Sequence, residues 1–310
     1  MSEPMSDDEL IKMFEKDCRV RELVYNTRRR YMANIELYRE FLDSNGGEGL
    51  LNPNKTILKS FVLYLRETRN HKKKTIDNMF SALNSFYDLL LFEELVSTNI
   101  ILACRKRFLR TYKAEEVVRK IPDIDVMSRF VNSISKPRDR AIVLLFCKTG
   151  IRRNELVTLD ADDINWAKQS LVLKPTAKRS NRLIYFDDEM ANLLKKWMHI
   201  RESFHPQTQA LFIGVGGERL KRQGVYHAVT KWAERYGLHN PNGKAVEDSF
   251  SPHAIRHWWT TMMRRGGMPR ELIKTLRGDV RKEAIDIYDH PDPEELRISY
   301  LKAVPQLGVL

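Results

Sequence analysis

The sequence lacks the features that mark secreted, membrane-spanning and low-complexity proteins. Its three cysteines, Cys18, Cys104 and Cys147, have no CxxC or CxxH spacing and predict neither a disulfide framework nor a zinc site. The longest apolar run covers seven residues, 141–147, whereas a membrane span needs roughly 20. Glycine (14) and proline (12) are scarce, which excludes collagen-like and low-complexity chains. The acidic N-terminus shows no secretory signal, so we expect a cytoplasmic protein.

Positive charge is what the sequence has in excess. The chain contains 53 Lys and Arg against 41 Asp and Glu, a formal net charge of +12. Its 310 residues fit two domains of roughly 150 residues each and are ample for a hydrophobic core. The charge favours a polyanionic partner, although charge alone says nothing about the fold.

Residues 1–110 have the pattern of a helical bundle. Apolar residues recur at helical spacing in three stripes, and the sequence Asn45-Gly46-Gly47 is expected to end the first helix. A bundle of about four helices would bury these stripes against one another. The stripes are Tyr31, Ile35, Tyr38 and Leu42; Ile57, Phe61 and Leu65; and Ile76, Phe80, Leu83, Tyr87 and Leu90.

Clusters of basic residues occur in and just after this region. Two of them lie at predicted helix starts, where N–H groups favour anions, so we expect phosphate contacts there; a solvated polar face is the alternative. Residues 111–121 continue a charged, weakly periodic stretch and predict a basic linker, either part of a clamp around a duplex or a plain tether. The clusters are Arg28, Arg29 and Arg30; Lys72, Lys73 and Lys74; and Arg105, Lys106 and Arg107.

Residues 122–290 predict a mainly helical domain with a small sheet. Residues 139–149 have the composition of a buried helix that ends at Gly150. Residues 170–174 and 182–186 are apolar and β-branched and are joined by a basic turn, which predicts a hairpin. Further helices are expected at 187–202, 218–236, 252–265 and 269–277. Lys221 and Arg222 lie on one of these helices and are candidates for phosphate contact, with a solvated face as the alternative.

Two short motifs carry arginines suited to binding a phosphate. TGIRRNEL, residues 149–156, places Arg152 after a glycine helix stop with Glu155 three residues on, although this spacing is also typical of a surface ion pair. SPHAIRH, residues 251–257, begins with Ser-Pro, a helix start, and projects His253 and Arg256 from the first turn. A capping or core histidine is the alternative reading of His253.

A third segment contains Asp279 and then AIDIYDH, residues 284–290. Together the three motifs resemble the tyrosine recombinase or phage integrase family, which includes the Xer and Cre-like enzymes. The resemblance covers residues 122–290 and implies an α+β catalytic domain preceded by a SAM-like helical core-binding domain over residues 1–110. It also implies that residues 291–310 dock on a neighbouring protomer; packing on the tail's own domain is the alternative.

The resemblance implies specific site residues. Arg152 and Arg256 would clamp the scissile phosphate, His253 would handle a proton, and Tyr288 would be the nucleophile, with Tyr300 in reserve. The family's lysine lies in the hairpin turn, where Lys178 is the first choice and Lys174 the second. Glu155 and His257 would hold these side chains in position without contacting the phosphate themselves.

Asp279 departs from the family pattern. The family usually has His or Trp nine residues before the tyrosine, and an ionised aspartate cannot donate to a phosphate oxygen. Asp279 could accept a proton or orient a neighbour, Arg277 or Lys282 could supply the donor, or activity could be impaired.

The predicted function is site-specific DNA recombination through a 3′-phosphotyrosyl intermediate. The resemblance implies that this covalent link stores the bond energy, so we expect no metal and no cofactor. The sequence agrees, since it has neither a P-loop nor an evident carboxylate cluster for two metals. The expected partners are double-stranded DNA at a recombination site and a possible DNA-bending accessory protein, with nucleoid association and no membrane. We expect a homo-tetramer on that DNA and a monomer or dimer in its absence. The rival readings are a catalytically impaired DNA-binding accessory protein of the same fold and an enzyme like type IB topoisomerases.

Overall fold

The computed structural model of the protein describes residues 5–109, 121–175, 182–243, 245, 247–279 and 291–309. The chain forms two compact units, Met1–Glu116 and Val117–Leu310, each with its own hydrophobic core. Of the predicted linker, only Ile121 lies within the described residues. The predicted fold class, mainly helical with a small sheet, is confirmed.

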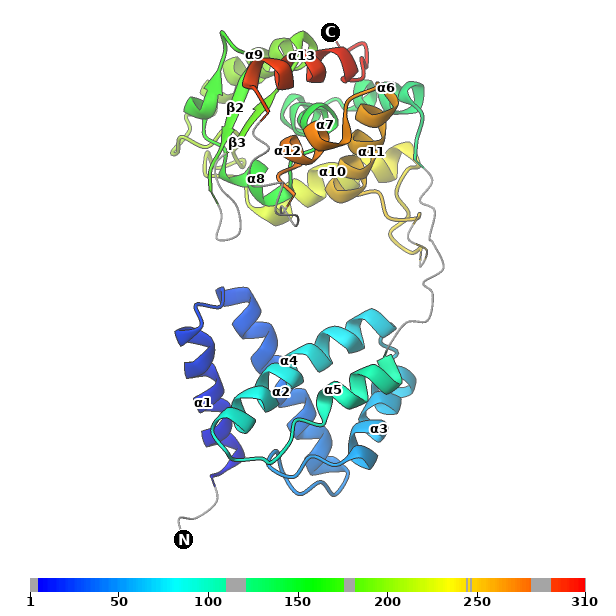
Figure 1. Ribbon diagram of the computed structural model, residues 1–310. Helices are drawn as coiled ribbons and strands as arrows, with labels where there is room; N and C mark the ends of the chain where they lie inside the picture. Colours follow the sequence, from blue (N-terminus) through cyan, green and yellow to red (C-terminus); the bar gives the residue numbers. More distant parts are fainter. Residues whose placement is uncertain are drawn as a thin grey trace. The chain divides into compact units, whose positions relative to one another are not determined.

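The N-terminal unit is helical throughout its described part (Figure 1). Ser6 caps its first helix, since Ser6 Oγ accepts from Glu9 N at 3.3 Å while Ser6 N donates to Glu9 Oε2 at 2.8 Å. The second helix ends at Ser44, directly before the predicted stop. The elements are α1 (Asp7–Val20), α2 (Tyr25–Ser44), α3 (Lys55–Leu63), the π-helical turn η1 (Tyr64–Thr68), α4 (Lys73–Phe92), α5 (Ile101–Cys104) and the π-helical turn η2 (Arg105–Leu109).

The predicted apolar stripes form the core of this unit. Phe61 on α3 packs on Tyr38 of α2 with ring centroids 5.0 Å apart, and on Phe80 of α4 at 6.0 Å. Two stripe residues, Tyr31 and Ile57, are only partly buried. The hydrophobic face of each helix therefore points inward, as a 3.6-residue period requires.

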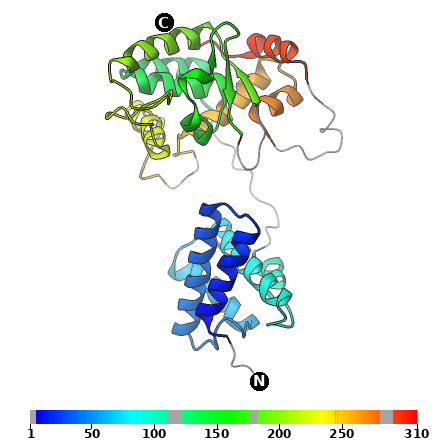
Figure 2. The same ribbon diagram turned by 90° about the vertical axis from the view of Figure 1, so that its left-hand side faces the viewer.

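The C-terminal unit combines helices with a three-stranded antiparallel sheet of order β1-β2-β3, which lies at one side of the unit (Figures 1 and 2). The predicted hairpin is present, with Leu171 opposite Ile184. Strand β1 was not expected from the sequence, and the helix expected from residue 218 begins at Arg222. The elements are α6 (Ile124–Ser133), α7 (Pro137–Thr149), α8 (Arg153–Thr158), the 3₁₀ turn η3 (Ala161–Asp163), β1 (Ile164–Asn165), β2 (Ser170–Leu173), β3 (Arg182–Tyr185), α9 (Asp188–Glu202), α10 (Arg222–Tyr236), α11 (Pro252–Arg265), α12 (Arg270–Arg277) and α13 (Pro293–Ala303).

Helix α7 is the centre of this unit. Its apolar run 141–147 is fully buried, and the helix contacts α6, α9, α10 and α11. Two tryptophans of α11 anchor that helix to the core, because Trp258 Nε1 donates to Pro122 O and Trp259 Nε1 donates to Lys148 O, both at 2.8 Å. This packing fixes the end of α7 beside the start of α11.

The C-terminal tail packs on its own unit in this single chain. Leu296, Tyr300 and Leu307 are buried in the core of the C-terminal unit. This is the alternative that the sequence left open, and docking on a neighbouring protomer stays a prediction. Tyr300 is a wrong choice of reserve nucleophile, because its fully buried hydroxyl donates to Lys148 O at 3.0 Å.

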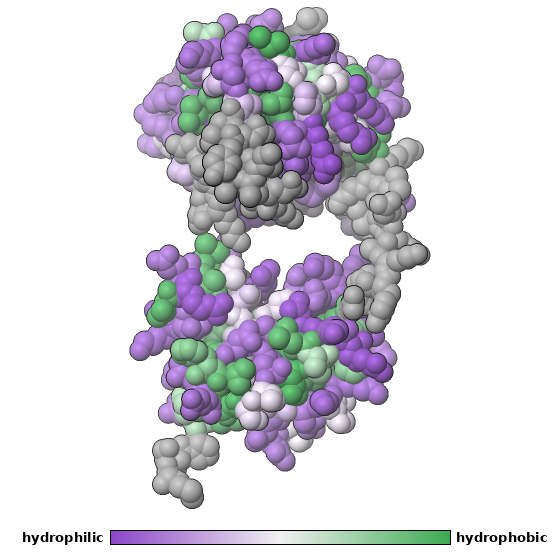
Figure 3. Space-filling model, viewed as in Figure 1, coloured by the Kyte–Doolittle hydropathy of each residue, from purple (hydrophilic) through white to green (hydrophobic). Residues whose placement is uncertain are grey.

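Hydrophilic residues predominate on the visible face of the C-terminal unit (Figure 3). Among the described helices, none has the length and apolar composition that a membrane span requires.

Candidate active site

The turn between α7 and α8 positions the first arginine. Gly150 ends α7 with a φ of 58°, in the left-handed region, and a Cβ at this position would lie 2.3 Å from the ring of Trp259. Only glycine satisfies both the positive φ and the short distance to Trp259, since it has no Cβ and adopts positive φ at low cost. Arg152 follows two residues later and precedes the first residue of α8.

Arg152 binds the end of α12. Its Nη1 donates to Arg277 O at 2.6 Å and to Glu155 Oε1 at 3.3 Å, and its Nη2 donates to Asp279 Oδ1 at 3.2 Å. Glu155 also accepts from the backbone N–H of Arg152 at 2.7 Å. The carboxylate three residues on therefore fixes both the backbone and the side chain of Arg152.

Arg256 reaches the same acceptors from α11. Its Nη1 donates to Gly150 O at 2.6 Å, and its Nη2 donates to Arg277 O at 2.8 Å and to Asp279 Oδ1 at 3.3 Å. Arg256 is only 4% exposed. Two arginines that are far apart in the sequence thus share one backbone carbonyl and one carboxylate oxygen.

These shared acceptors lie at the C-terminal end of α12. Arg277 is the last residue of that helix, and Gly278 ends it with a φ of 59°. Carbonyls at a helix C-terminus lack intrahelical partners and carry partial negative charge, which favours nearby cations. Asp279 adds a full negative charge, and its Oδ2 lies 3.1 Å from Arg277 Nε.

Burial and neighbouring positive charges both act on the pKa of Arg256. Burial and then repulsion from Arg152 and Arg277 lower the pKa of Arg256 to about 9, while Glu155 and Asp279 act in the opposite direction. The guanidinium therefore stays protonated at neutral pH, in surroundings that favour an additional anion.

Arg182 is a site residue that the sequence did not predict. It lies at the start of β3, donates to both carboxylate oxygens of Glu155 at 2.9 and 2.8 Å, and donates to Leu276 O at 3.0 Å. Burial raises the pKa of Glu155, but the hydrogen bonds and charges of Arg182 and Arg152 outweigh it, so that this pKa is lowered. Arg182 thereby joins the hairpin to α8 and to α12.

His253 and His257 lie one turn apart on the exposed side of α11. Their Nε2 atoms are 3.0 Å apart, and the rings meet edge to face with centroids at 4.5 Å. His253 is exposed, whereas Arg256 on the same turn is buried. The helix start predicted at Ser251-Pro252 is present, with Ser251 at the N-cap.

Two of the predicted site residues, the hairpin lysine Lys178 and the nucleophile Tyr288, lie outside the described residues. Lys174 forms ion pairs with Asp160 and, at 3.6 Å, with Asp163. Its hydrogen bond to Asp160 raises the pKa of Lys174 despite partial burial.

Basic residues suggested for phosphate contact lie in both units. Arg28, in the first part of α2, is partly buried, and Arg105 is bound to Asp77 at 2.9 Å. Arg222 begins α10 near Arg153, whose pKa is lowered by burial and then by repulsion from Arg222. The remaining exposed candidates are Arg29, Arg30, Lys72, Lys73, Lys74, Lys106, Arg107 and Lys221.

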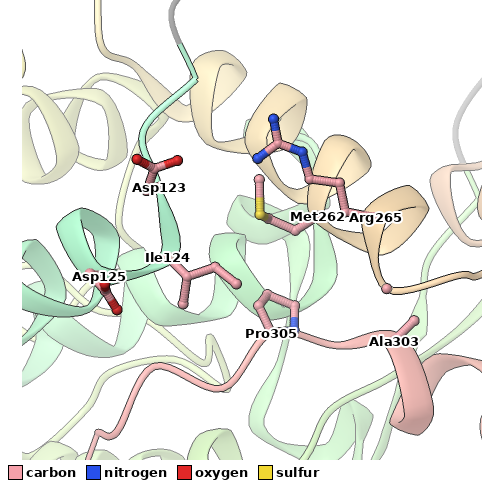
Figure 4. A pocket seen from close by; sticks show the side chains of 8 residues that line it. Asp123, Ile124, Asp125, Met262, Arg265, Ala303 and Pro305 are labelled. Atoms are coloured by element: carbon pink, nitrogen blue, oxygen red, sulfur yellow. The ribbon is translucent and has the colours of Figure 1, made fainter.

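A pocket of about 340 Å³ lies at the far end of α11 from Arg256 (Figure 4). Its lining includes Asp123, Met262, Arg265 and Pro305, and it contains none of the site residues described above. Within the described ranges, no group of His, Cys, Asp and Glu side chains is arranged to hold a metal ion.

Comparison with known proteins identifies the family. A model of the phage integrase family matches residues 116–295, and a model of the phage integrase N-terminal SAM-like domain matches residues 10–96. The first match covers more than half of the chain. The chain belongs to the phage integrase family. It is accordingly a tyrosine recombinase, as its motifs predicted, with a SAM-like domain at its N-terminal end.

Named relatives of this phage integrase family member agree with that assignment. The chain is 24% identical over 285 residues to tyrosine recombinase XerC of Leptospira interrogans serovar copenhageni, covering 90% of this chain and 88% of the relative. It is 26% identical over 290 residues to tyrosine recombinase XerC of Escherichia coli O139:H28, covering 92% of each.

Solved integrase structures share the fold. The Tn1549 transposon integrase in complex with transposon right end DNA matches with a TM-score of 0.73 at 16% identity, covering 94% of this chain and 98% of that one. A lambda integrase dimer bound to a COC' core site matches with a TM-score of 0.70 at 17% identity, covering 93% and 98%.

Proposed function

We propose that this recombinase cuts and rejoins DNA with Arg152 and Arg256 bound to the scissile phosphate and Tyr288 as the nucleophile. The observation that carries the proposal is the convergence of the two guanidinium groups, which donate to the same carbonyl and the same carboxylate oxygen. A pair of forked donors aimed at one point suits the two non-bridging oxygens of a phosphodiester.

The arginine pair would lower the barrier by electrostatic stabilisation. Attack on a phosphodiester adds negative charge to its non-bridging oxygens in the pentavalent transition state, and fixed cations stabilise that charge without reorganising. An unperturbed tyrosine phenol has a pKa of about 10 and is therefore mostly protonated at neutral pH. In the proposed complex, the positive charges of Arg152 and Arg256 would favour the phenolate form of Tyr288 as the reaction proceeds.

The covalent step exchanges one phosphoester for another. The Tyr288 oxygen forms a bond to phosphorus, the bond from phosphorus to the 5′-oxygen breaks, and the 3′-phosphate remains attached to the tyrosine. His253 takes the phenolic proton, and Lys178 gives a proton to the leaving 5′-oxygen, a contribution typically worth ~10²–10⁴-fold. Attack by a second 5′-hydroxyl reverses these bonds and completes strand exchange.

The wider assembly is also a proposal. Residues 1–110 and 122–290 would bind the duplex from two sides, with residues 111–121 as the linker and the basic clusters on backbone phosphates. The position of Arg222 near Arg153 supports a phosphate contact beside the active site. We further propose a tetramer on nucleoid DNA, residues 291–310 docked between protomers, and a DNA-bending accessory protein.

Trapping of a covalent adduct tests the proposal. Duplexes selected from a random library by binding to the full chain are nicked near the cleavage point, so that the released fragment diffuses away and the adduct accumulates. We expect an adduct with the wild type and none with Tyr288→Phe, while Tyr300→Phe serves as the matched control and keeps it. An adduct with Tyr288→Phe, or bound DNA without any adduct in the wild type, would refute the proposal and favour the accessory-protein reading.

A further inference from the structure

Asp279 occupies the point on which the two arginines converge. Its Oδ1 accepts from Arg152 Nη2 at 3.2 Å and from Arg256 Nη2 at 3.3 Å, and its Oδ2 lies 3.1 Å from Arg277 Nε. One carboxylate therefore bridges three guanidinium groups. A carboxylate and a phosphate both offer oxygens to the forked N–H groups of arginine, so the two anions suit the same donors.

The acceptors around the arginines differ in how easily they can leave. Arg277 O and Gly150 O belong to helix ends and are fixed by α12 and α7, and the Glu155 side chain is 4% exposed and held by Arg182. The Asp279 side chain is 30% exposed and follows the glycine that ends α12. Of these acceptors, the Asp279 carboxylate is the one that a rotation of its own side chain can remove.

We propose that Asp279 is an internal stand-in for the scissile phosphate, which neutralises the arginine pair before DNA binds and is displaced by the incoming phosphodiester. The proposal rests on the proposed function, because it assigns the phosphate to the same two arginines. It explains why an acidic residue is compatible with a site that must bind an anion. In this scheme Asp279 acts through the two arginines and touches neither the DNA nor the reacting atoms.

The alternative role for Asp279 is to orient the two arginines permanently, but other groups already orient them. Glu155 fixes Arg152 through its backbone N–H and its Nη1, and Gly150 O with Arg277 O fixes Arg256. When Asp279 leaves, one Nη2 hydrogen on each arginine becomes available for a phosphate oxygen. The backbone contacts can remain in place throughout.

Inorganic sulfate tests the displacement without DNA or Tyr288. The thermal unfolding of the full chain is measured with sodium sulfate and with sodium chloride at equal ionic strength, for the wild type and for Asp279→Asn. The matched control is Glu271→Gln, which removes the same charge from an exposed pair with Lys274 on α12. We expect sulfate to bind Asp279→Asn about tenfold more tightly than the wild type. Hydrogen bonds to a charged acceptor are roughly twice as strong as those to a neutral one, so the neutral amide competes less well than the carboxylate with sulfate for the two arginines.

A second variant locates the effect at the arginines. Adding Arg152→Gln to Asp279→Asn should abolish the extra stabilisation by sulfate. Equal sulfate effects in the wild type, Asp279→Asn and Glu271→Gln would overturn the proposal, as would an extra effect that persists without Arg152. A wild type that forms no DNA adduct refutes the proposed function instead, so the two failures are distinguishable.

Discussion

Lys148 offers a sharp test of what holds the C-terminal tail. It is fully buried, and its Nζ lies 2.5 Å from Asp187 Oδ2, 2.5 Å from Glu189 Oε2 and 2.7 Å from Pro305 O. Replacing it by Met keeps an unbranched chain of similar length but leaves two carboxylates without their cation. Removing one partner of a buried ion pair costs about 3–5 kcal/mol, so we expect Lys148→Met to lower the free energy of unfolding by about that amount.

The tail should loosen together with this network. Glu189 also accepts from the backbone N–H groups of Leu307 at 3.0 Å and of Val309 at 3.1 Å, and Asp187 accepts from Gln306 Nε2 at 3.1 Å. To accept these hydrogen bonds, the Glu189 carboxylate must remain ionised and must keep its present position. In Lys148→Met we therefore expect faster hydrogen exchange at the amides of Leu307 and Val309 than in the wild type.

The pH dependence gives an independent check. Burial raises the pKa of Glu189, but its hydrogen bonds with Lys148 and the tail outweigh burial and lower this pKa in the folded state. A depressed folded-state pKa stabilises the protein above the carboxyl's unfolded pKa, and that stability is lost as the pH falls through the folded pKa. The difference between the wild type and Lys148→Met should therefore shrink as Glu189 becomes protonated.

Tryptophan fluorescence measures this unit alone. All five tryptophans lie in the C-terminal unit, so urea unfolding followed at their emission reports its stability without a signal from residues 1–110. The control is Lys274→Met, which breaks an exposed pair with Glu271 and should change stability by no more than about 1 kcal/mol. A loss below about 1 kcal/mol for Lys148→Met, or a difference that does not shrink in acid, would refute the reasoning. The five are Trp166, Trp197, Trp232, Trp258 and Trp259.

Three further substitutions test individual contacts. Gly150→Ala should lower the free energy of unfolding in urea by more than about 1–2 kcal/mol, because its Cβ would clash with the Trp259 ring and its backbone would be strained in the left-handed region. It should also reduce the adduct yield, because the clash displaces Arg152. Near-wild-type stability would contradict this expectation. Tyr300→Phe should cost about 1 kcal/mol in the same assay through its lost bond to Lys148 O; an unchanged midpoint would argue against that bond. Lys174→Met should keep adduct formation, whereas Lys178→Met should slow it ~10²–10⁴-fold in single-turnover gels; the opposite ranking would exchange the two lysines.

Local sequence patterns predicted most of the fold. The stop at Gly150 and the strand pairing of residues 170–173 with 182–185 follow from short-range glycine and β-branched signals. Strand β1 has two residues, too few for an alternating pattern to be visible. The sequence predicts that α10 begins near residue 218, whereas Arg219 pairs with Ile213 in an isolated bridge and the helix begins at Arg222. No local period encodes such a bridge.

The candidate site was predictable only where its residues lie in motifs. Arg152 and Arg256 each follow a recognisable helix stop or start, whereas Arg182 is one of several basic residues in a hairpin. Its importance comes from a long-range pair with Glu155, and spacing along the chain cannot reveal that pair. One signal was available: Arg182 shares a strand face with the buried Ile184, and a charged residue on an inward face needs a partner.

Arg256 shows why this site requires protein acceptors before any substrate arrives. A guanidinium that is 4% exposed has lost most of its water, and burying an unpaired charge is costly. The carbonyls of Gly150 and Arg277 replace part of that water, and each is a helix-terminal group without an intrahelical partner of its own. These carbonyls neutralise no charge, so the pair of arginines still attracts an anion. The same arrangement that stabilises the empty site therefore leaves one position for a carboxylate or a phosphate, and DNA binding becomes a competition between the two.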